Sequence, residues 1–191
     1  EDISLMRSIP NMTVIVPADA TETHQAMAFA VEYKGPVYLR LGRMSVPDVF
    51  GESYEFRLGK AALLAEGSDV AIIAVGVMVS AARQAADELK QAGISARVLN
   101  MATIKPIDKE AIIEAAKATG AVVTCEEHSI IGGLGSAVAE VLVENHPVPM
   151  ERVGVMDVFG ESGTPDALLA KYHLTATDIV LAAKRAVSRK K

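Results

Sequence analysis

The hydrophobic pattern of the chain changes period at regular intervals from residue 69 onward. Short apolar runs, rich in β-branched residues, occupy 70–75, 96–101, 121–125 and 153–156. Between these runs, apolar residues recur every three or four positions. Short apolar runs are typical of buried parallel strands, and the longer spacing is typical of helices with one apolar face. The alternation predicts an α/β fold with an open, mainly parallel sheet and helices on both faces.

Residues that favour helix starts support this order. Ser80 is predicted to cap a helix that runs to about residue 92, and a second helix is predicted at 109–119. Thr164 stands directly before a proline, a residue that favours the first position of a helix. Thr175 is predicted to cap a last helix that runs to about residue 188.

Residues 1–43 form a smaller predicted unit. Its order is helix, strand, helix and strand, at 3–9, 12–16, 20–33 and 37–41. Asp19, with Glu22 three residues later, predicts a capping box at the start of the second helix. Because two such units are too few to bury an independent core, we expect this domain to continue upstream of Glu1.

The segment 44–64 has no apolar period and contains proline, aspartate and glycine, so it is predicted to be a linker. A short edge strand is expected near its end, at 61–65. The predicted organisation is therefore a truncated domain at 1–43, the linker, and a second domain at 65–191.

The stretch 121–145 is the clearest candidate for a functional site. Its strand is followed by three polar residues and three glycines: Glu126, Glu127, His128, Gly132, Gly133 and Gly135. Ligands of open α/β sheets bind at the carboxyl ends of strands, where these residues fall. A dinucleotide fingerprint fails, because Val138 stands where its third glycine or alanine belongs. Two interpretations stay open: a structural and dimer-interface loop, or a small-anion or regulatory site at the helix N-terminus after Gly135.

Composition excludes several other functions. The net charge of −5, with no basic stripe before the C-terminal tail, argues against a nucleic-acid surface. The single cysteine, Cys125, permits no internal disulfide and fits a reducing cytoplasm. No apolar run is long enough to span a membrane. No second cluster of His, Cys, Asp or Glu stands at ligand spacing, so we expect no metal site in these residues.

Five segments resemble, in the same order, the C-terminal part of a transketolase. They are EDISLMRSIPNMTVIVPADATE, GPVYLRLGR, VLNMATIKPID, TCEEHSIIGGLGSAVAEVL and FGESGTPDALLAKY. The resemblance is closest to the separate C-terminal subunit of split transketolases. Deoxyxylulose-phosphate synthase and the beta subunits of 2-oxo acid dehydrogenases share the layout less closely. On this template, residues 1–43 are the back half of a pyrimidine-binding domain, and residues 65–191 are the transketolase C-terminal domain.

The resemblance implies transfer of a two-carbon ketol unit between sugar phosphates, in pentose phosphate metabolism. It implies thiamine diphosphate and magnesium or calcium in the complete enzyme, with neither expected on this fragment alone. The partners would be the N-terminal transketolase half, on the same or a separate chain, and a second copy in a homodimer. The family's catalytic residues fall upstream of Glu1, so the isolated chain is expected to be inactive.

One functional side chain carries over from the family. Arg43, in PVYLRLGRMSVP, aligns with the family arginine that binds the substrate phosphate, and Arg40 is the second candidate. Two alternatives remain at this point. The chain could be a non-catalytic dimerisation or regulatory module, or it could be part of one of the related thiamine diphosphate enzymes.

Overall fold

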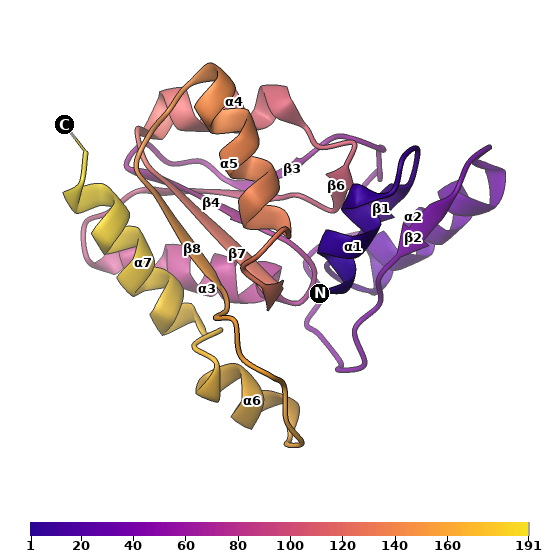
Figure 1. Cartoon of the computed structure of the whole chain (residues 1–191). Helices are drawn as coiled ribbons and strands as arrows, with labels where there is room; N and C mark the ends of the chain where they lie inside the picture. The colour runs from indigo at the N-terminus through magenta and orange to yellow at the C-terminus, as the bar shows by residue number, and fades with distance from the viewer. Residues whose placement is uncertain (191) are drawn as a thin grey trace.

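The structure, a computed structural model, describes residues 1–190 and shows two lobes side by side (Figure 1). The smaller lobe contains a three-stranded sheet with the order β2-β1-β6, and the larger lobe contains a five-stranded sheet with the order β3-β5-β4-β7-β8. The elements are, in chain order, α1 (Asp2–Ser8), β1 (Thr13–Ile15), α2 (Ala20–Glu32), β2 (Val37–Leu39), β3 (Ala62–Ala65), β4 (Val70–Ala74), α3 (Met78–Gln91), β5 (Ala96–Asn100), β6 (Thr103–Lys105), α4 (Lys109–Thr119), β7 (Val122–Ser129), α5 (Leu134–Asn145), β8 (Met150–Val155), α6 (Pro165–Lys171) and α7 (Ala176–Ser188).

The larger sheet is mainly parallel, as the sequence predicts. β4 pairs in parallel with both β5 and β7, and β7 pairs in parallel with β8. Only β3, at one edge, is antiparallel to its neighbour β5. All five residues of β4 are buried, which explains why its sequence is an unbroken apolar run rather than an alternation.

Helices cover both faces of this sheet, which confirms the predicted layers (Figure 1). α3 and α7 bury an alanine-rich stripe against one face, together with Leu89 and Ile179. α4 and α5 bury Ile112, Leu134 and Val138 against the other face. Ile3 of α1 joins this second core, so the two lobes share one hydrophobic interior.

The smaller sheet contains a strand that the sequence analysis did not predict. β1 pairs in parallel with β2 on one side and antiparallel with β6 on the other. β6 is only three residues long and directly precedes the cis peptide bond between Lys105 and Pro106. A run that short has no readable period. A segment from the predicted second domain therefore completes the sheet of the first lobe.

The predicted helix starts are mostly confirmed. The side chain of Asp19 accepts a hydrogen bond from the amide of Glu22, and Thr175 forms a full capping box with Asp178. Ser80 is not a cap, because α3 already begins at Met78 and the Ser80 hydroxyl donates to the carbonyl of Val77. Pro165 occupies the predicted position at the start of α6.

Two strand bounds differ from the prediction. β7 continues through the polar residues to Ser129 instead of ending at Cys125, because β8 pairs with it as far as Val155. β8 itself begins at Met150 rather than at residue 153. Within residues 1–190, no helix combines the length and the apolar character that a membrane span requires.

The segment between the lobes folds back over α2. The amides of Val49 and Phe50 donate to the side chain of Asp19, at 2.7 and 2.8 Å. The ring of Phe50 stacks on Tyr54, with 3.7 Å between the ring centroids. The Gln25 side chain bonds the carbonyl of Tyr54 and the amide of Phe56. This contact set fixes the path of a segment whose sequence shows no period.

Candidate functional site

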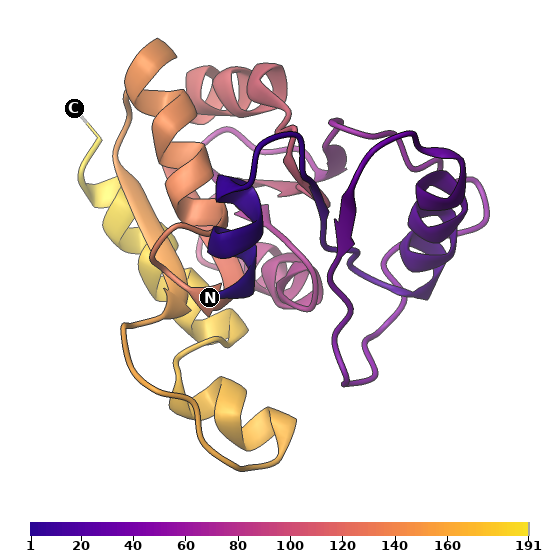
Figure 2. The same ribbon diagram turned by 45° about the vertical axis from the view of Figure 1, so that its right-hand side comes forward.

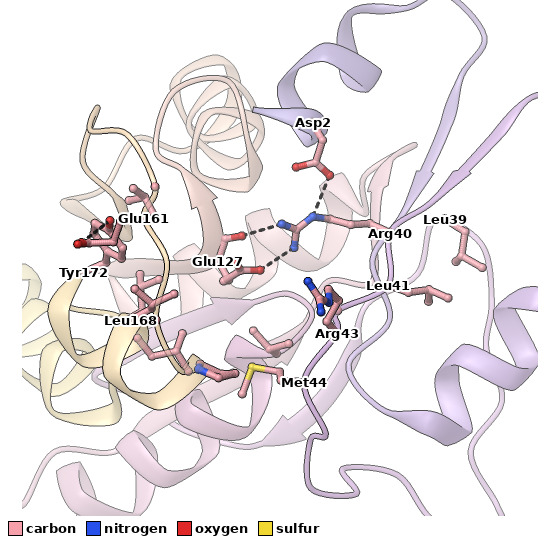
Figure 3. A pocket seen from close by; sticks show the side chains of 18 of the residues that line it. Asp2, Leu39, Arg40, Leu41, Arg43, Met44, Glu127, Glu161, Leu168 and Tyr172 are labelled. Atoms are coloured by element: carbon pink, nitrogen blue, oxygen red, sulfur yellow. Dashed lines mark hydrogen bonds and ion pairs between the residues drawn. The ribbon is translucent and has the colours of Figure 1, made fainter.

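A cleft of about 980 Å³ lies where the two lobes meet (Figure 3). Its walls are the end of β2 with the residues that follow it, Glu127 of β7, and α6 with the loop before it. The carboxyl ends of β2 and β7, which belong to different sheets, therefore face one space. This is the position where open α/β sheets bind ligands.

Arg43 lines this cleft and is exposed to solvent. It follows β2 by four residues, and Figure 3 shows it on the Arg40 side of the cleft. Among residues 1–190, no side chain or carbonyl forms a hydrogen bond or ion pair with its guanidinium. Its donors are available to a ligand.

Arg40 lines the same cleft but is bonded in a different way. Its Nε donates to Asp2 Oδ2 at 2.8 Å, and its Nη1 and Nη2 donate to the Glu127 carboxylate and carbonyl at 3.0 and 3.1 Å (Figure 3). Burial acts to lower the pKa of Arg40, but the charges of Glu127 and Asp2 outweigh it and raise the pKa above its usual value. Burial likewise opposes ionisation of Asp2, but hydrogen bonds from Tyr38 and Arg40 hold the pKa of Asp2 below its usual range.

The structure thus brings the two candidate arginines together with Glu127, which the sequence assigned to a different site. The side chain of His128, the next residue, is buried, with Nε2 3.9 Å from Asp2 Oδ1. Its Nδ1 lies 2.6 Å from the Ser129 carbonyl, and its buried Nε2 has no hydrogen-bond partner among residues 1–190. Burial lowers the pKa of His128, so the ring is neutral near pH 7.

The glycine turn after β7 is built around Glu126. Its carboxylate accepts hydrogen bonds from the amides of Leu134 and Gly135 at 2.7 and 2.8 Å, at the start of α5. The free amides predicted to attract a small anion therefore donate to a carboxylate of the same chain. Burial is the largest influence on Glu126, and although the two amides oppose it, the pKa rises to about 7.

The glycines give this carboxylate its room. A Cβ on Gly133 would overlap Glu126 Oε2, so no side chain fits there. Gly132 has a φ of +77°, a conformation that other residues rarely adopt, and its carbonyl accepts a hydrogen bond from Arg7 at 2.7 Å. Arg7 also pairs with Glu140 of α5. The turn is therefore tied to α1 of the smaller lobe (Figure 2).

Glu22 is a second buried carboxylate, and the sequence analysis did not predict the several hydrogen bonds that it accepts. The predicted capping box is wrong in its second half, because Glu22 accepts from the amide of Ala18 rather than from that of Asp19. It also accepts from the Tyr54 hydroxyl and from the Asn100 side-chain amide. The only sequence signal was a glutamate in a first helical turn, which is common on helix surfaces.

The described residues do not form a metal site by themselves. Between residues 1 and 190, no group of three His, Cys, Asp or Glu side chains is placed to hold an ion. Three carboxylates line the cleft: those of Asp2 and Glu127 are paired with Arg40, and that of Glu161 is paired with Lys171.

Comparison with known proteins identifies both lobes. The family described as "Transketolase, C-terminal domain" matches residues 59–179, and the family described as "Transketolase, pyrimidine binding domain" matches residues 1–49. The 6-deoxy-6-sulfo-D-fructose transketolase subunit of a Clostridium species is 53% identical over 190 residues, which cover 100% of this chain and 59% of that protein. One of the subunits of the apulose-4-phosphate transketolase of Phocaeicola vulgatus is 46% identical over 174 residues, covering 91% and 55%.

A solved structure agrees with these relatives. It is titled "Split gene transketolase, inactive beta4 tetramer", superposes with a TM-score of 0.97 and is 56% identical. The match covers 100% of this chain and 63% of that one. The chain thus spans less than two thirds of the length of each of these three proteins. Since both family descriptions and the relatives agree with the fold and with the order of its lobes, the chain belongs to the transketolase family.

Proposed function

We propose that this chain is the C-terminal part of a transketolase that transfers a two-carbon ketol unit between sugar phosphates. It would act together with an N-terminal half, on the same or a separate polypeptide. Enzymes of this family depend on thiamine diphosphate, and the coenzyme supplies the carbanion chemistry when it is bound. The proposed cation, magnesium or calcium, would be held by residues of the other half.

The observation that supports a substrate role for this chain is the free guanidinium of Arg43 in the cleft between the lobes. A guanidinium fork matches two oxygens of a tetrahedral oxyanion, so it suits the terminal phosphate of a sugar. Two relatives are named for sugars that carry a sulfo or a phosphate group. Arg43 would therefore bind and orient the anionic end of the substrate, while the reaction takes place at the other end.

The relative titled an inactive β4 tetramer supports two further parts of the proposal. The isolated chain would not turn over, and it would associate with copies of itself, as the expected homodimer requires. Ketol transfer should appear when the N-terminal half, thiamine diphosphate and magnesium are added. Transfer by the chain alone would contradict the first part, and a monomer in size-exclusion chromatography would contradict the second.

Arg43→Ala in the complete enzyme tests the role of this arginine. We expect the KM for a phosphorylated ketose donor to rise by about tenfold to a hundredfold, the size of one charge-assisted pair, with a much smaller change for the same sugar without phosphate. Arg57→Ala is the control, because Arg57 is 72% exposed, pairs with Glu55 and does not line the cleft. Equal changes for the two donors would refute phosphate binding by Arg43.

A further inference from the structure

Arg40 joins three segments that are far apart in the sequence. Its side chain is 21% exposed, and its guanidinium binds Asp2 of α1 and Glu127 of β7, which belong to different lobes. Asp2 also accepts a hydrogen bond from the hydroxyl of Tyr38, at 2.8 Å. The end of β2 is therefore fastened on one side to the smaller lobe and on the other to the larger sheet.

Arg40 is also the last residue before Arg43 whose backbone is hydrogen-bonded. Its amide donates to the carbonyl of Ile15 at 2.9 Å. Beyond it, residues 41–43 make no backbone hydrogen bond to any other residue in the range 1–190. Arg40 is therefore the nearest hydrogen-bonded residue on the N-terminal side of Arg43, and Val49 is the nearest on its C-terminal side.

The charges around Arg40 differ from those around Arg43. Two carboxylates contact the Arg40 guanidinium, so a sugar phosphate bound to it would lie close to two like charges. Like charges at such separations repel, and the repulsion is stronger in a partly buried place than in water. Arg43 contacts no carboxylate among residues 1–190, so it can accept an oxyanion without this cost.

We propose that Arg40 is a positioning residue, which holds the segment after β2, with Arg43 in it, in the cleft by bridging Asp2 and Glu127 and does not itself bind the phosphate. This role depends on the proposed function of Arg43. It makes Glu127, in the other lobe, a determinant of affinity for the anionic end of the sugar through its hold on Arg40.

The two possible roles of Arg40 predict opposite effects of Glu127→Gln in the complete enzyme. If Arg40 positions Arg43, loss of the bridging charge loosens β2, and the KM for a phosphorylated ketose rises by about tenfold relative to the same sugar without phosphate. If Arg40 is a ligand, neutralising Glu127 removes a competing carboxylate, and that KM falls. Inorganic phosphate, used as a competitive inhibitor, should change its inhibition constant in the same direction as KM.

A double variant shows whether Glu127→Gln changes phosphate affinity through Arg43 or through a wider loss of structure around the cleft. In the Arg43→Ala background, Glu127→Gln should produce no further change in the ratio of the two KM values, because residues that act as one unit are not additive. Arg40→Lys keeps the charge but cannot bridge both carboxylates, so it should raise the ratio in the otherwise unchanged enzyme. In the Arg43→Ala background it should leave the ratio unchanged, whereas loss of a phosphate ligand would raise the ratio further. This variant tests the role even if Glu127→Gln fails to fold.

Glu55→Gln is the matched control, since Glu55 is 74% exposed and pairs with an arginine outside the cleft. Three results would overturn the positioning role. They are a fall in the KM for the phosphorylated ketose in Glu127→Gln, an unchanged ratio of the two KM values in that variant, and additive effects in the double variant. Failure of the proposed function looks different, because the unchanged enzyme would then transfer no ketol unit, or Arg43→Ala would leave the donor ratio unaltered.

Discussion

Glu22 and Glu126 are both fully buried carboxylates, but the groups that bond them differ in kind. The donors to Glu22 include the Tyr54 hydroxyl and the Asn100 amide, 32 and 78 residues away in the sequence. The donors to Glu126 are two backbone amides, 8 and 9 residues away in the turn that follows its own strand. One carboxylate joins separate parts of the fold, and the other shapes a single turn.

The difference shows that burial alone does not reveal what a carboxylate does. Burial is the largest influence on both groups and raises the pKa of each, while the hydrogen bonds that each accepts act in the opposite direction. Loss of Glu22 should therefore weaken contacts in both lobes. Loss of Glu126 should weaken the structure only at the start of α5 and at the contact of α5 with α1.

The largest expected effect is that of Glu22→Ala. The change leaves the amide of Ala18, the Asn100 side chain and the Tyr54 hydroxyl without their acceptor, and we expect the free energy of unfolding to fall by about 3–5 kcal/mol. Urea denaturation measures it, with Glu32→Ala on the exposed side of α2 as control. A loss no larger than that of the control would show that Glu22 joins nothing of consequence.

The next effect depends on pH. The folded pKa of Glu126 is about 7, above its usual 4.5, so its contribution to stability is complete below pH 4.5 and is lost as the pH rises through 7. At 1.36 kcal/mol per pH unit, the loss totals about 3 kcal/mol. Glu126→Gln should not show this loss, so the stability difference between wild type and variant should shrink over that range.

Neighbouring groups make the comparison with this variant necessary. His128 lies 3.6 Å from Glu126, and its lowered pKa makes the protein less stable as the pH falls, which is the opposite trend. Urea denaturation from pH 5 to pH 8 gives the measurement. Parallel curves for wild type and variant would contradict the raised pKa of Glu126.

The smallest effect is that of Gly133→Ala, which tests the turn without changing a charge. The new Cβ would overlap Glu126 Oε2, and relieving this overlap should cost about 2 kcal/mol of stability. Gly51→Ala is the control, since no atom lies within 4 Å of its added Cβ. Thermal unfolding distinguishes the two variants. If they unfold at the same temperature, the glycine is not needed for the carboxylate to fit.

The sequence predicted features that depend on nearby residues. The order of strands and helices follows from apolar spacing within each segment. The caps at Asp19 and Thr175 need only the next three residues. β6 was missed because its strand character depends on β1, which lies about ninety residues earlier. The extension of β7 was missed because it depends on pairing with β8.

In the candidate site, too, the individual residues were predicted from the sequence, but the contacts between distant residues were not. Arg43 was identified through resemblance to the transketolase family, and Arg40 and Glu127 were both named as candidates. The contact between Arg40 and Glu127 was not predicted, since the two residues are 87 positions apart and belong to different sheets. The two interpretations of the loop around Glu126 could not be separated from the sequence for a related reason. An anion site and an internal carboxylate place the same demand on a helix N-terminus.

The antiparallel pairing of β6 with β1 restricts how this protein can be recombined. A chimera joined in the segment 44–64 would take residues 1–43, with β1, from one parent and the larger lobe, with β6, from another. The pairing of β6 with the edge of β1 would then join strands from two different proteins. Unpaired strand edges promote aggregation. Domain swaps between transketolases should therefore keep residues 1–43 with their own larger lobe.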